Sequence, residues 1–263
     1  MLKQLLALPA LRAAAKSTAD WVDLQWSYLI EQLVAIAPQT HGKMLDVGCG
    51  DCPYEHIFTP YVDSYTGVER KTTFELTTSA ARSGGRAPDV LYEGDRLPFD
   101  DETFDCALSV QVLEHTPDPE PLVMEMGRVL KKGGLLILNA PFSFRLHEEP
   151  HDYFRYTPHG LAEMCRRAGM TVDKTLPQGL LFSVLGHKLN SFLAFRVAHM
   201  DALMQDMGKL GHEGKAAKRA RTWTLPVVLP AMLGVSAAAR VLDRVAPDET
   251  ESLSYLVLAK KVR

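Results

Sequence analysis

The sequence predicts an α/β fold: a doubly wound, mostly parallel sheet with N-terminal helices in front of it and a helical insertion before its last strand. Short apolar runs alternate with amphipathic stretches from residue 43 to 175, which is the pattern of repeated βαβ units. Between residues 177 and 251 the alternation stops, and Leu, Met, Ala and Phe recur at helical spacing. A final apolar run at 253–259 then restores the strand pattern.

The individual elements follow from the spacing of apolar residues. Three stretches carry apolar residues at helical spacing and are predicted as helices: 20–36, 119–130 and 158–168. Gly133 and Gly134 are expected to form the C-terminal turn of the second helix, ahead of the fifth strand. The runs that have the length of single strands are 44–47, 64–68, 89–93, 104–110, 135–139, 171–175 and 253–259.

These elements divide the chain into four parts. We expect an N-terminal helical segment at 1–40, a core at 41–176, an insertion or lid at 177–251 and the last core strand at 252–263. At 263 residues, with 46% hydrophobic and 23% charged side chains, the chain can bury a full core.

Composition also limits the partners and the location. The net charge of -3 creates no field that attracts a polyanion, so no nucleic-acid partner is expected. Residues 1–16 fit a short amphipathic helix better than a secretion signal, because the apolar stretch is brief and contains Pro9. The sequence shows no run of about 20 apolar residues, so no membrane-spanning helix is expected. We therefore expect a cytoplasmic protein.

The cysteines give weak support to redox or metal chemistry. Cys49 and Cys52 match a C-x-x-C pattern, which occurs in redox pairs and in halves of zinc sites. The sequence contains no second such pair, and both thiols lie inside a glycine turn. Cys106 and Cys165 lie in apolar segments and are expected to be buried small hydrophobic residues. Free thiols are the favoured state.

The first strand leads into a turn that is typical of nucleoside binding. Asp46 is followed by Gly48 and Gly50, so the strand ends in a D-x-G-x-G pattern. Glycines let the backbone turn sharply and approach a ligand where a Cβ would clash. The following helix points its N-terminus at that ligand. Glu69 ends the second strand, where an acidic side chain can bond ribose hydroxyls.

The glycine turn and the acidic residue Glu69 are compatible with two classes of cofactor, a dinucleotide and a positively charged nucleoside. A dinucleotide site expects a third glycine at position 53, where this chain has Pro53. The carboxylate of Asp46, just before the turn, would repel a pyrophosphate but suits an ammonium or sulfonium group. The residues therefore favour a nucleoside that carries positive charge over a dinucleotide.

With these motifs the sequence resembles the class I S-adenosylmethionine (SAM)-dependent methyltransferases, in the broad small-molecule, type 11-like group with a VLEH motif. The resemblance covers roughly residues 44–175 and the last strand, and it implies a Rossmann-like fold with SAM as cofactor. The segments that match in the family's order are LDVGCG, YTGVE, EGDRLPF, FDCALSVQVLEH and LKKGGLLILNAPF.

The resemblance also implies which residues hold SAM. Glu69 would bind the ribose, Asp95 the adenine amino group and the Arg96 backbone amide the adenine ring. Cys52 departs from the family pattern, because it stands where a third small glycine is usual. The full set of cofactor residues implied in this way is Asp46, Gly48, Gly50, Glu69, Asp95, Arg96, Val110 and Gln111.

His147-Glu148-Glu149-Pro150-His151 matches the H-E-x-x-H pattern of zinc proteases. That chemistry needs both histidines on one face of a helix, and Pro150 disfavours a helix at this point. We therefore assign no metal ligands. Residues 147–157 are predicted instead to form one loop after the fifth strand.

This loop is predicted to border the acceptor. Open α/β sheets bind ligands beyond the carboxyl ends of their strands, and HDYFRYTPHGL resembles a loop beside the acceptor pocket in a subset of the same methyltransferases. For a hydroxyl acceptor we expect His151 as the base and Asp152 as its orienting partner. His115, which follows the fourth strand, is the rival base, and Tyr153 and Arg155 are expected to face the acceptor.

The sequence therefore predicts an enzyme, a SAM-dependent methyltransferase that moves a methyl group to a small-molecule or lipid-linked acceptor, with O-methylation favoured. Two alternatives stay open. One is an NAD-type oxidoreductase on a similar sheet. The other is a non-catalytic SAM-binding protein, since cofactor motifs do not by themselves establish catalysis.

The insertion allows two interpretations. It could form lid helices packed on the sheet edge, with its basic residues on a solvated face. Alternatively, residues 209–239 contact a membrane surface peripherally and admit a lipid-linked acceptor. Pro226 and Pro230 and the short apolar length count against a spanning helix. The basic residues that precede the apolar stretch beginning at Trp223 are Lys209, Lys215, Lys218, Arg219 and Arg221.

Overall fold

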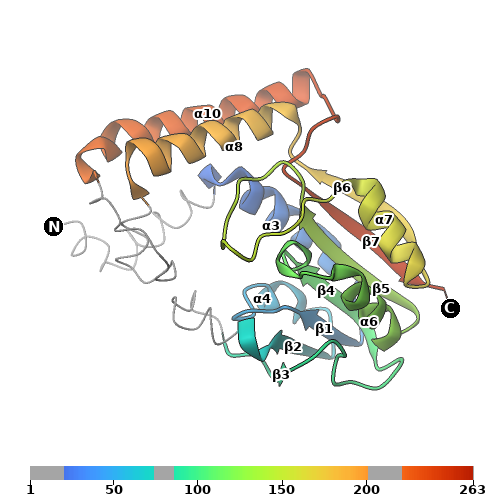
Figure 1. The fold of residues 1–263 in the computed structure, drawn as a ribbon. Coiled ribbons are helices and arrows are strands. Elements are labelled where there is room, and N and C mark those ends of the chain that lie inside the picture. Colours follow the sequence, from blue (N-terminus) through green and yellow to red (C-terminus); the bar gives the residue numbers. More distant parts are fainter. Residues whose placement is uncertain (1–20, 74–85, 201–220, 263) are drawn as a thin grey trace. The chain divides into compact units, whose positions relative to one another are not determined.

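The computed structural model describes residues 21–73, 86–200 and 221–262 (Figure 1). The chain forms two compact units. A helical unit comprises, of the described residues, 21–31, 178–200 and 221–253, and a sheet unit comprises 32–177 and 254–262. The first residues of the N-terminal helix thus group with the insertion. The helix expected within residues 1–16 lies outside the described residues.

The sheet unit is a seven-stranded, mostly parallel sheet, as the sequence predicts, and its strand order is β3-β2-β1-β4-β5-β7-β6. β1 pairs in parallel with β2 and β4, β2 with β3, and β4 with β5, whereas β7 runs antiparallel to β5. The strands are β1 Lys43–Val47, β2 Ser64–Arg70, β3 Val90–Tyr92, β4 Phe104–Val110, β5 Leu130–Pro141, β6 Met170–Gln178 and β7 Ser254–Lys261.

Helices cover the sheet because its central strands are buried on both faces. The α6 helix, Pro119–Val129, turns Leu122, Met126 and Val129 towards the core, and the α7 helix, Pro158–Arg167, adds Leu161 and Cys165 to the same cluster. The other helical elements that reach into this unit are α3 Leu24–Ile36, η1 Ala37–Gln39, α4 Glu55–Phe58 and η2 Leu113–His115.

The junction of α6 and β5 differs from the sequence prediction. β5 begins at Leu130, directly after the helix, and Gly133 and Gly134 lie inside the strand instead of forming a helix C-cap. The register against β4 shifts between Phe104 and Cys106 at this point, and Gly133 has a φ of 79°. The two glycines therefore form an irregularity in the strand, of the kind that a β-bulge produces.

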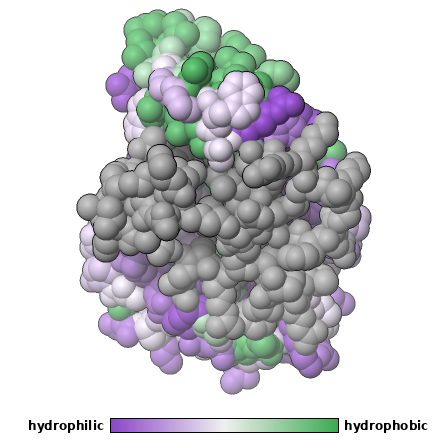
Figure 2. Space-filling view, turned by 90° about the vertical axis from the view of Figure 1, so that its left-hand side faces the viewer, coloured by the Kyte–Doolittle hydropathy of each residue, from purple (hydrophilic) through white to green (hydrophobic). Residues whose placement is uncertain are grey.

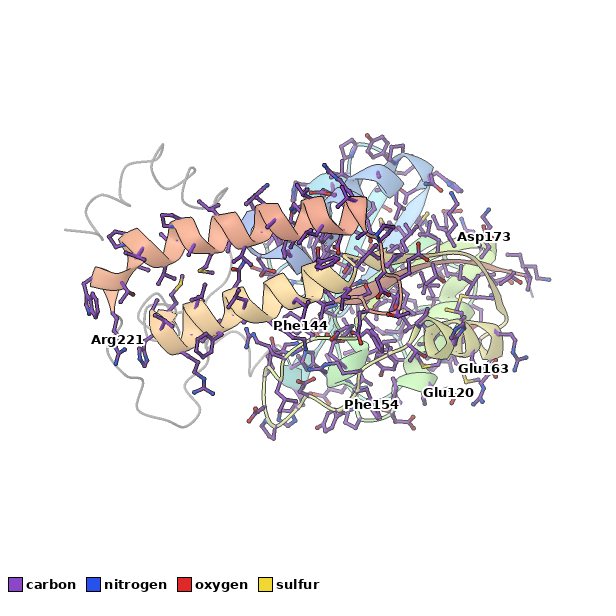
Figure 3. All side chains as sticks on the ribbon, turned by 90° about the horizontal axis from the view of Figure 1, so that it is seen from above. Glu120, Phe144, Phe154, Glu163, Asp173 and Arg221 are labelled. Atoms are coloured by element: carbon purple, nitrogen blue, oxygen red, sulfur yellow. The ribbon has the colours of Figure 1, made fainter. Side chains whose placement is uncertain are left out.

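The helical unit is built around α8, Leu181–Phe192, and α10, Leu225–Val245, which lie side by side in Figures 1 and 3. Asp243 of α10 caps the start of α8, where its carboxylate accepts hydrogen bonds from the backbone N–H groups of Leu180, Phe182 and Ser183 at 2.9–3.2 Å. The α8 helix continues into a π-helical turn, Leu193–Val197, and η4, Thr222–Thr224, precedes α10.

The length of α10 corrects the expectation of a short, broken apolar stretch. Pro226 lies in the first turn, where a backbone N–H has no partner within the helix. Pro230 lies one turn further on, and its missing N–H removes a single backbone hydrogen bond, the one to the carbonyl of residue 226. The helical stretch Thr222–Val245 has 24 residues and a mean hydropathy of 1.8, with 22% of its apolar window buried. Among the described residues it is the only helix that is long and apolar enough to cross a membrane.

Candidate functional site

The site lies where the strand order reverses. β1 is flanked by β2 on one side and by β4 on the other, and the chain leaves these parallel strands at the same edge of the sheet. Ligands of open α/β sheets bind in the crevice outside the carboxyl ends at such a switch point. The predicted cofactor residues Gly48, Glu69 and Gln111 follow or end β1, β2 and β4 there.

The glycine turn and Glu69 hold each other. Gly48 and Gly50 have φ angles of 73° and 53°, in the left-handed region that favours glycine. One oxygen of the buried Glu69 carboxylate accepts the backbone N–H of Gly50 at 2.9 Å, and the other accepts that of Arg70 at 2.8 Å. Burial raises the pKa of Glu69. These bonds fix the carboxylate beside the turn, and its role as a ribose ligand stays a prediction.

Gly48 and Gly50 have different roles in the turn. A Cβ added at Gly48 would overlap the side chain of Val112, so this position is closed by the protein itself. A Cβ added at Gly50 would meet no atom within 4 Å. The absence of a side chain therefore leaves space for a ligand at Gly50, whereas at Gly48 it allows close packing of the turn against the segment after β4.

Asp46 is buried, with 1% of its surface exposed, and accepts a hydrogen bond from the Tyr65 hydroxyl. Burial raises the pKa of this carboxyl to about 7, while the bond from Tyr65 acts in the opposite direction. The sequence pattern does not predict that Tyr65 bonds Asp46. Its partnership follows only from the parallel register of β1 and β2, in which Met44 lies opposite Tyr65.

The remaining predicted cofactor residues lie at the same edge of the sheet. Asp95 follows β3 with 91% of its side chain exposed and lies 3.6 Å from Arg70 at the end of β2. Arg96 is also exposed, at 74% of its side chain. Val110 ends β4 and is buried. Gln111 has a φ of 56°, and its side-chain amide donates to the Asn139 side chain at 2.7 Å.

Cys49 and Cys52 are free, buried thiols. Cys52 has a φ of 54°, which explains why a third small glycine is usual at this position. The two sulfur atoms pack over Gly67, where an added Cβ would lie 2.6 and 2.8 Å from them. The neighbouring thiol and burial raise the pKa of Cys49, which is the opposite of what a reactive thiolate needs.

The loop after β5 is anchored through Arg155. Its guanidinium binds both oxygens of Asp152 at 2.6 and 2.7 Å and donates to the carbonyls of Phe144 and Arg145. Burial by itself would raise the pKa of Asp152, but this pairing and one hydrogen bond from the His147 backbone N–H lower it to about 2. Figure 3 labels Phe144 and Phe154 on the same segment.

The loop also docks onto the segment that follows β4. The Tyr156 hydroxyl donates to the carbonyl of Leu113 at 2.9 Å, and the backbone N–H of Tyr153 donates to that of Glu114 at 2.8 Å. The loop after β5 and the VLEH segment therefore pack against each other.

The expected pairing of His151 with Asp152 is not what the structure shows. Asp152 is bound by Arg155 and by the backbone N–H of His147, whereas the exposed His151 ring lies 3.0 Å from the Tyr153 hydroxyl. The reason is the strength of the two-pronged guanidinium–carboxylate bond, which takes up both oxygens of Asp152. Asp152 thus positions the loop. The role of His151 as a base stays a prediction.

Three side chains that the sequence did not bring together meet beneath this loop. Glu114 is fully buried, and neither of its carboxylate oxygens has a hydrogen-bond partner among the described residues. The Nε2 atoms of His115 and His147 lie 3.8 and 3.9 Å from one of these oxygens. Burial raises the pKa of Glu114 to about 8 and lowers that of His147. In the sequence, Glu114 and His115 belong to the VLEH motif, and no pattern links them to His147.

Comparison with known proteins agrees with this geometry. A family model described as a methyltransferase domain matches residues 45–138, which run from β1 to β5. The matched segment of this chain, residues 45–138, is a methyltransferase domain. The remaining segments, including the helical unit, lie outside the matched residues.

Relatives of this methyltransferase domain carry the same description. An uncharacterized methyltransferase of Mycobacterium marinum is 35% identical over 162 residues, covering 60% of this chain and 61% of the relative. Another, from Mycobacterium sp. strain KMS, is 42% identical over 96 residues, 36% of this chain and 37% of the relative. The chain thus spans less than two thirds of the length of these relatives. They are methyltransferases, which counts against the oxidoreductase alternative.

Solved structures confirm the fold. The [4+2]-cyclase SpnF is 21% identical with a TM-score of 0.53, over 90% of this chain and 81% of that one. A putative methyltransferase in complex with the Haloferax volcanii Trm112 activator is 15% identical with a TM-score of 0.54, over 95% and 96% of the two chains. The fold therefore hosts more than one activity, and function has to be argued from the site.

The residues present fit SAM as the cofactor. The space beside Gly50 is open, the Glu69 carboxylate is held next to it, and Asp46 places a second acidic group behind the turn. An adenosine ribose would meet Glu69, and the acidic group of Asp46 suits a sulfonium cation better than it suits a pyrophosphate.

Proposed function

We propose that the protein transfers the methyl group of SAM to a hydroxyl group of a small-molecule or lipid-linked acceptor. The observation that carries the proposal is the packing of the 142–157 loop against the segment after β4. This packing places titratable side chains at the same sheet edge as the glycine turn. Open α/β sheets bind both reactants at that edge.

The protein's part in this reaction is binding and orientation. SAM, when bound, supplies a methyl group on a good leaving group, so little covalent chemistry is left for the chain. Glu69 and the glycine turn hold the nucleoside, and Arg155 with Asp152 holds the loop that faces the acceptor. An acceptor fixed in line with the transferable methyl group gains most of the rate enhancement from proximity. His151 would take the hydroxyl proton.

Incubation with deuterated-methyl SAM and a host extract tests the proposal. We expect a product whose mass increases by the labelled methyl group and whose label is stable to conditions that hydrolyse methyl esters and sulfonium groups. A labelled amine would retain methyl transfer but overturn O-methylation. Bound SAM without any labelled product, in extracts that include lipids, would support the non-catalytic alternative.

The role of His151 has its own test. We expect His151→Ala to lower kcat by roughly 10²–10⁴ while the SAM affinity is unchanged, because a base acts on the acceptor and not on the cofactor. His159→Ala, an exposed histidine on α7, is the matched control. A loss below tenfold would mean that positioning alone suffices, and His151 would then lose its assigned role.

The helical unit supports a lipid-linked acceptor. Trp223 and Val227 of the α10 segment are 77% and 74% exposed, and Val245 at its other end is 71% exposed. On α8, Leu185, Leu189 and Phe192 are exposed at helical spacing. Figure 2 shows hydrophobic residues gathered over these helices at the top of the view.

We infer from this apolar surface a peripheral contact with the cytoplasmic face of a membrane. Arg221, beside the start of α10 in Figure 3, ends a basic run whose other members lie outside the described residues. Basic residues next to an exposed, Trp-headed apolar helix are typical of interfacial anchors. The opposite face of α10 packs Val228, Met232 and Ser236 inside the helical unit, and this packing favours a helix that lies on the surface over one that spans it.

A further inference from the structure

Three titratable side chains lie close together where the loop after β5 packs on η2, and the mechanism proposed above gives none of them a role. Glu114 and His115 belong to η2, directly after β4, and His147 belongs to the loop after β5. One ligand-type atom of each of these three residues lies within 4.8 Å of the others. The imidazoles are mostly buried, with 18% and 17% of their side chains exposed, and the carboxylate is at 0%.

The hydrogen bond of His115 determines which ring nitrogen carries the proton and which one presents its lone pair to the Glu114 carboxylate. Nδ1 of His115 lies 2.7 Å from the carbonyl oxygen of His151. A carbonyl only accepts hydrogen bonds, so Nδ1 carries the proton. In the neutral ring Nε2 is then an acceptor, and this is the atom that faces Glu114.

His147 is oriented in the same way. Its Nδ1 lies 3.3 Å from the Arg145 carbonyl oxygen and 3.4 Å from a carboxylate oxygen of Asp152. Both neighbours are acceptors, so the proton belongs on Nδ1 and the lone pair on Nε2. A histidine whose second nitrogen donates to a carbonyl or carboxylate is the usual arrangement behind a metal ligand.

Three acceptors therefore converge on one point. The distances of 3.8 and 3.9 Å from Nε2 of His115 and His147 to Glu114 Oε1 are too long for hydrogen bonds. Both oxygens of Glu114 are buried without a hydrogen-bond partner among the described residues. Burying an unsatisfied carboxylate is costly unless a cation compensates it.

We propose that Glu114, His115 and His147 bind a divalent transition-metal ion of the zinc class. Two imidazoles and one carboxylate are ligands that Zn²⁺ accepts, with an open fourth position, whereas Mg²⁺ and Ca²⁺ prefer oxygen ligands alone. Zinc ligands at about 2.0–2.2 Å from the metal place neighbouring donor atoms about 3.4 Å apart, so closure requires each atom to move by roughly half an ångström. Glu148, with a carboxylate oxygen 3.7 Å from His115 Nε2, can supply a further ligand.

This site differs from the one that the H-E-x-x-H pattern would predict. The segment 147–151 is not helical, and the His151 ring turns to the Tyr153 hydroxyl. His151 contributes its backbone carbonyl to His115 instead of a ligand. If the proposed function holds, the open position of the ion would also suit a hydroxyl oxygen, whose proton a bound metal makes easier to remove.

Metal binding is measured on the full chain, without SAM or acceptor. The protein is stripped with a chelator and then titrated with Zn²⁺ by calorimetry and with Co²⁺ by visible absorption. We expect one equivalent to bind to the wild-type chain, with a d–d spectrum typical of a four- or five-coordinate nitrogen and oxygen site. Glu114→Gln, His115→Ala and His147→Ala should each weaken affinity by at least about 100-fold, since even the loss of outer-shell partners costs 10–100-fold.

His151→Ala is the decisive matched variant, because it removes the other histidine of the sequence pattern. Our site predicts that its metal affinity changes less than threefold, whereas a site built from the H-E-x-x-H pattern predicts a large loss. His159→Ala controls for surface histidines. Retained affinity in Glu114→Gln, or binding that tracks His151 or His159, would overturn the proposal.

Folding of the variants is checked by thermal melting. Without metal, Glu114→Gln should melt at or above the wild-type temperature, because it replaces a buried carboxylate that has no partner by a neutral amide. With excess Zn²⁺ the wild-type melting temperature should rise while that of Glu114→Gln stays put. No rise in the wild type would remove the metal site. SAM affinity, measured on the same samples, would then still report on the proposed function separately.

Discussion

Glu69 is the residue through which the cofactor assignment is most directly tested. Its carboxylate is held by the backbone N–H groups of Gly50 and Arg70, so it is already oriented before a ligand arrives. We expect Glu69→Ala to weaken SAM binding by about 1.5–3 kcal/mol, the scale of charge-assisted hydrogen bonds in a buried site. Calorimetric titration with SAM measures it, and Glu163→Ala on the surface of α7 is the control. Equal affinity in both variants would end the ribose assignment.

Asp46 makes a prediction about pH. Burial raises its pKa to about 7, whereas an unfolded aspartate has a pKa of about 3.9. Between these values the folded chain keeps a proton that the unfolded chain has lost. The contribution of Asp46 to stability is therefore greatest below pH of about 4 and falls as the pH rises to about 7.

The variant Asp46→Asn removes this dependence while the amide oxygen can still accept from Tyr65. We expect the variant to gain on the order of 2 kcal/mol relative to the wild type between pH 5 and pH 8. Denaturant unfolding of both proteins across that pH range measures the difference between their free energies of unfolding. The contributions of all other carboxylates to the pH dependence are the same in both proteins and cancel in this difference. Parallel stability curves would show that Asp46 is not protonated in the folded chain.

At the scale of elements, Asp243 joins two helices of the helical unit. Its carboxylate accepts three backbone N–H groups at the start of α8 from a position near the end of α10. We expect Asp243→Ala to lower the free energy of unfolding by about 2 kcal/mol or more, because capping bonds are lost and buried donors are left unpaired. Chemical denaturation measures the loss. Asp248→Ala, at a half-buried aspartate whose carboxylate accepts a solvent-exposed hydrogen bond from the Thr250 backbone N–H, should cost much less, and an equal loss would contradict the capping role.

At the scale of the whole molecule, membrane contact is tested by sedimentation with vesicles. We expect the protein to pellet with phosphatidylcholine vesicles that contain phosphatidylglycerol, to be released by high salt and to stay soluble with phosphatidylcholine alone. The double variant Trp223→Ser with Val227→Ser should lose most of the binding, since both side chains are more than 70% exposed.

The matched control is Val34→Ser, a valine on α3 that is 54% exposed and outside the helical unit. Lys218→Glu with Arg219→Glu tests the electrostatic part in residues outside the described ranges. A wild-type protein that remains in the supernatant with anionic vesicles at low salt would leave the helical unit as a lid, and the acceptor would then be sought among soluble molecules.

Much of the sheet unit could be predicted because its signals are local. The short apolar run before Gly48 and the acidic residue Glu69 at the end of a strand follow from periodicity and turn chemistry, whereas Gln111 is implied only by the family resemblance. Parallel strands place their carboxyl ends at one edge, so the predicted cofactor residues come together there once the strand order is known. One prediction from local sequence is wrong. Gly133 and Gly134 are typical of a helix end, but the pairing of β4 with β5 makes them part of a strand.

The chain order of the motifs by itself determined the fold class and the cofactor class. Tertiary structure alone decided the partners of individual side chains. Asp152 could have oriented His151, but the guanidinium of Arg155 took both its oxygens. Glu114 and His147 come from different loops, and only the docking of one loop on the other brings them within reach of one metal ion. Hydrogen bonds and metal ligation depend on distances of a few ångströms across the fold, and periodicity along a sequence carries no information about those distances.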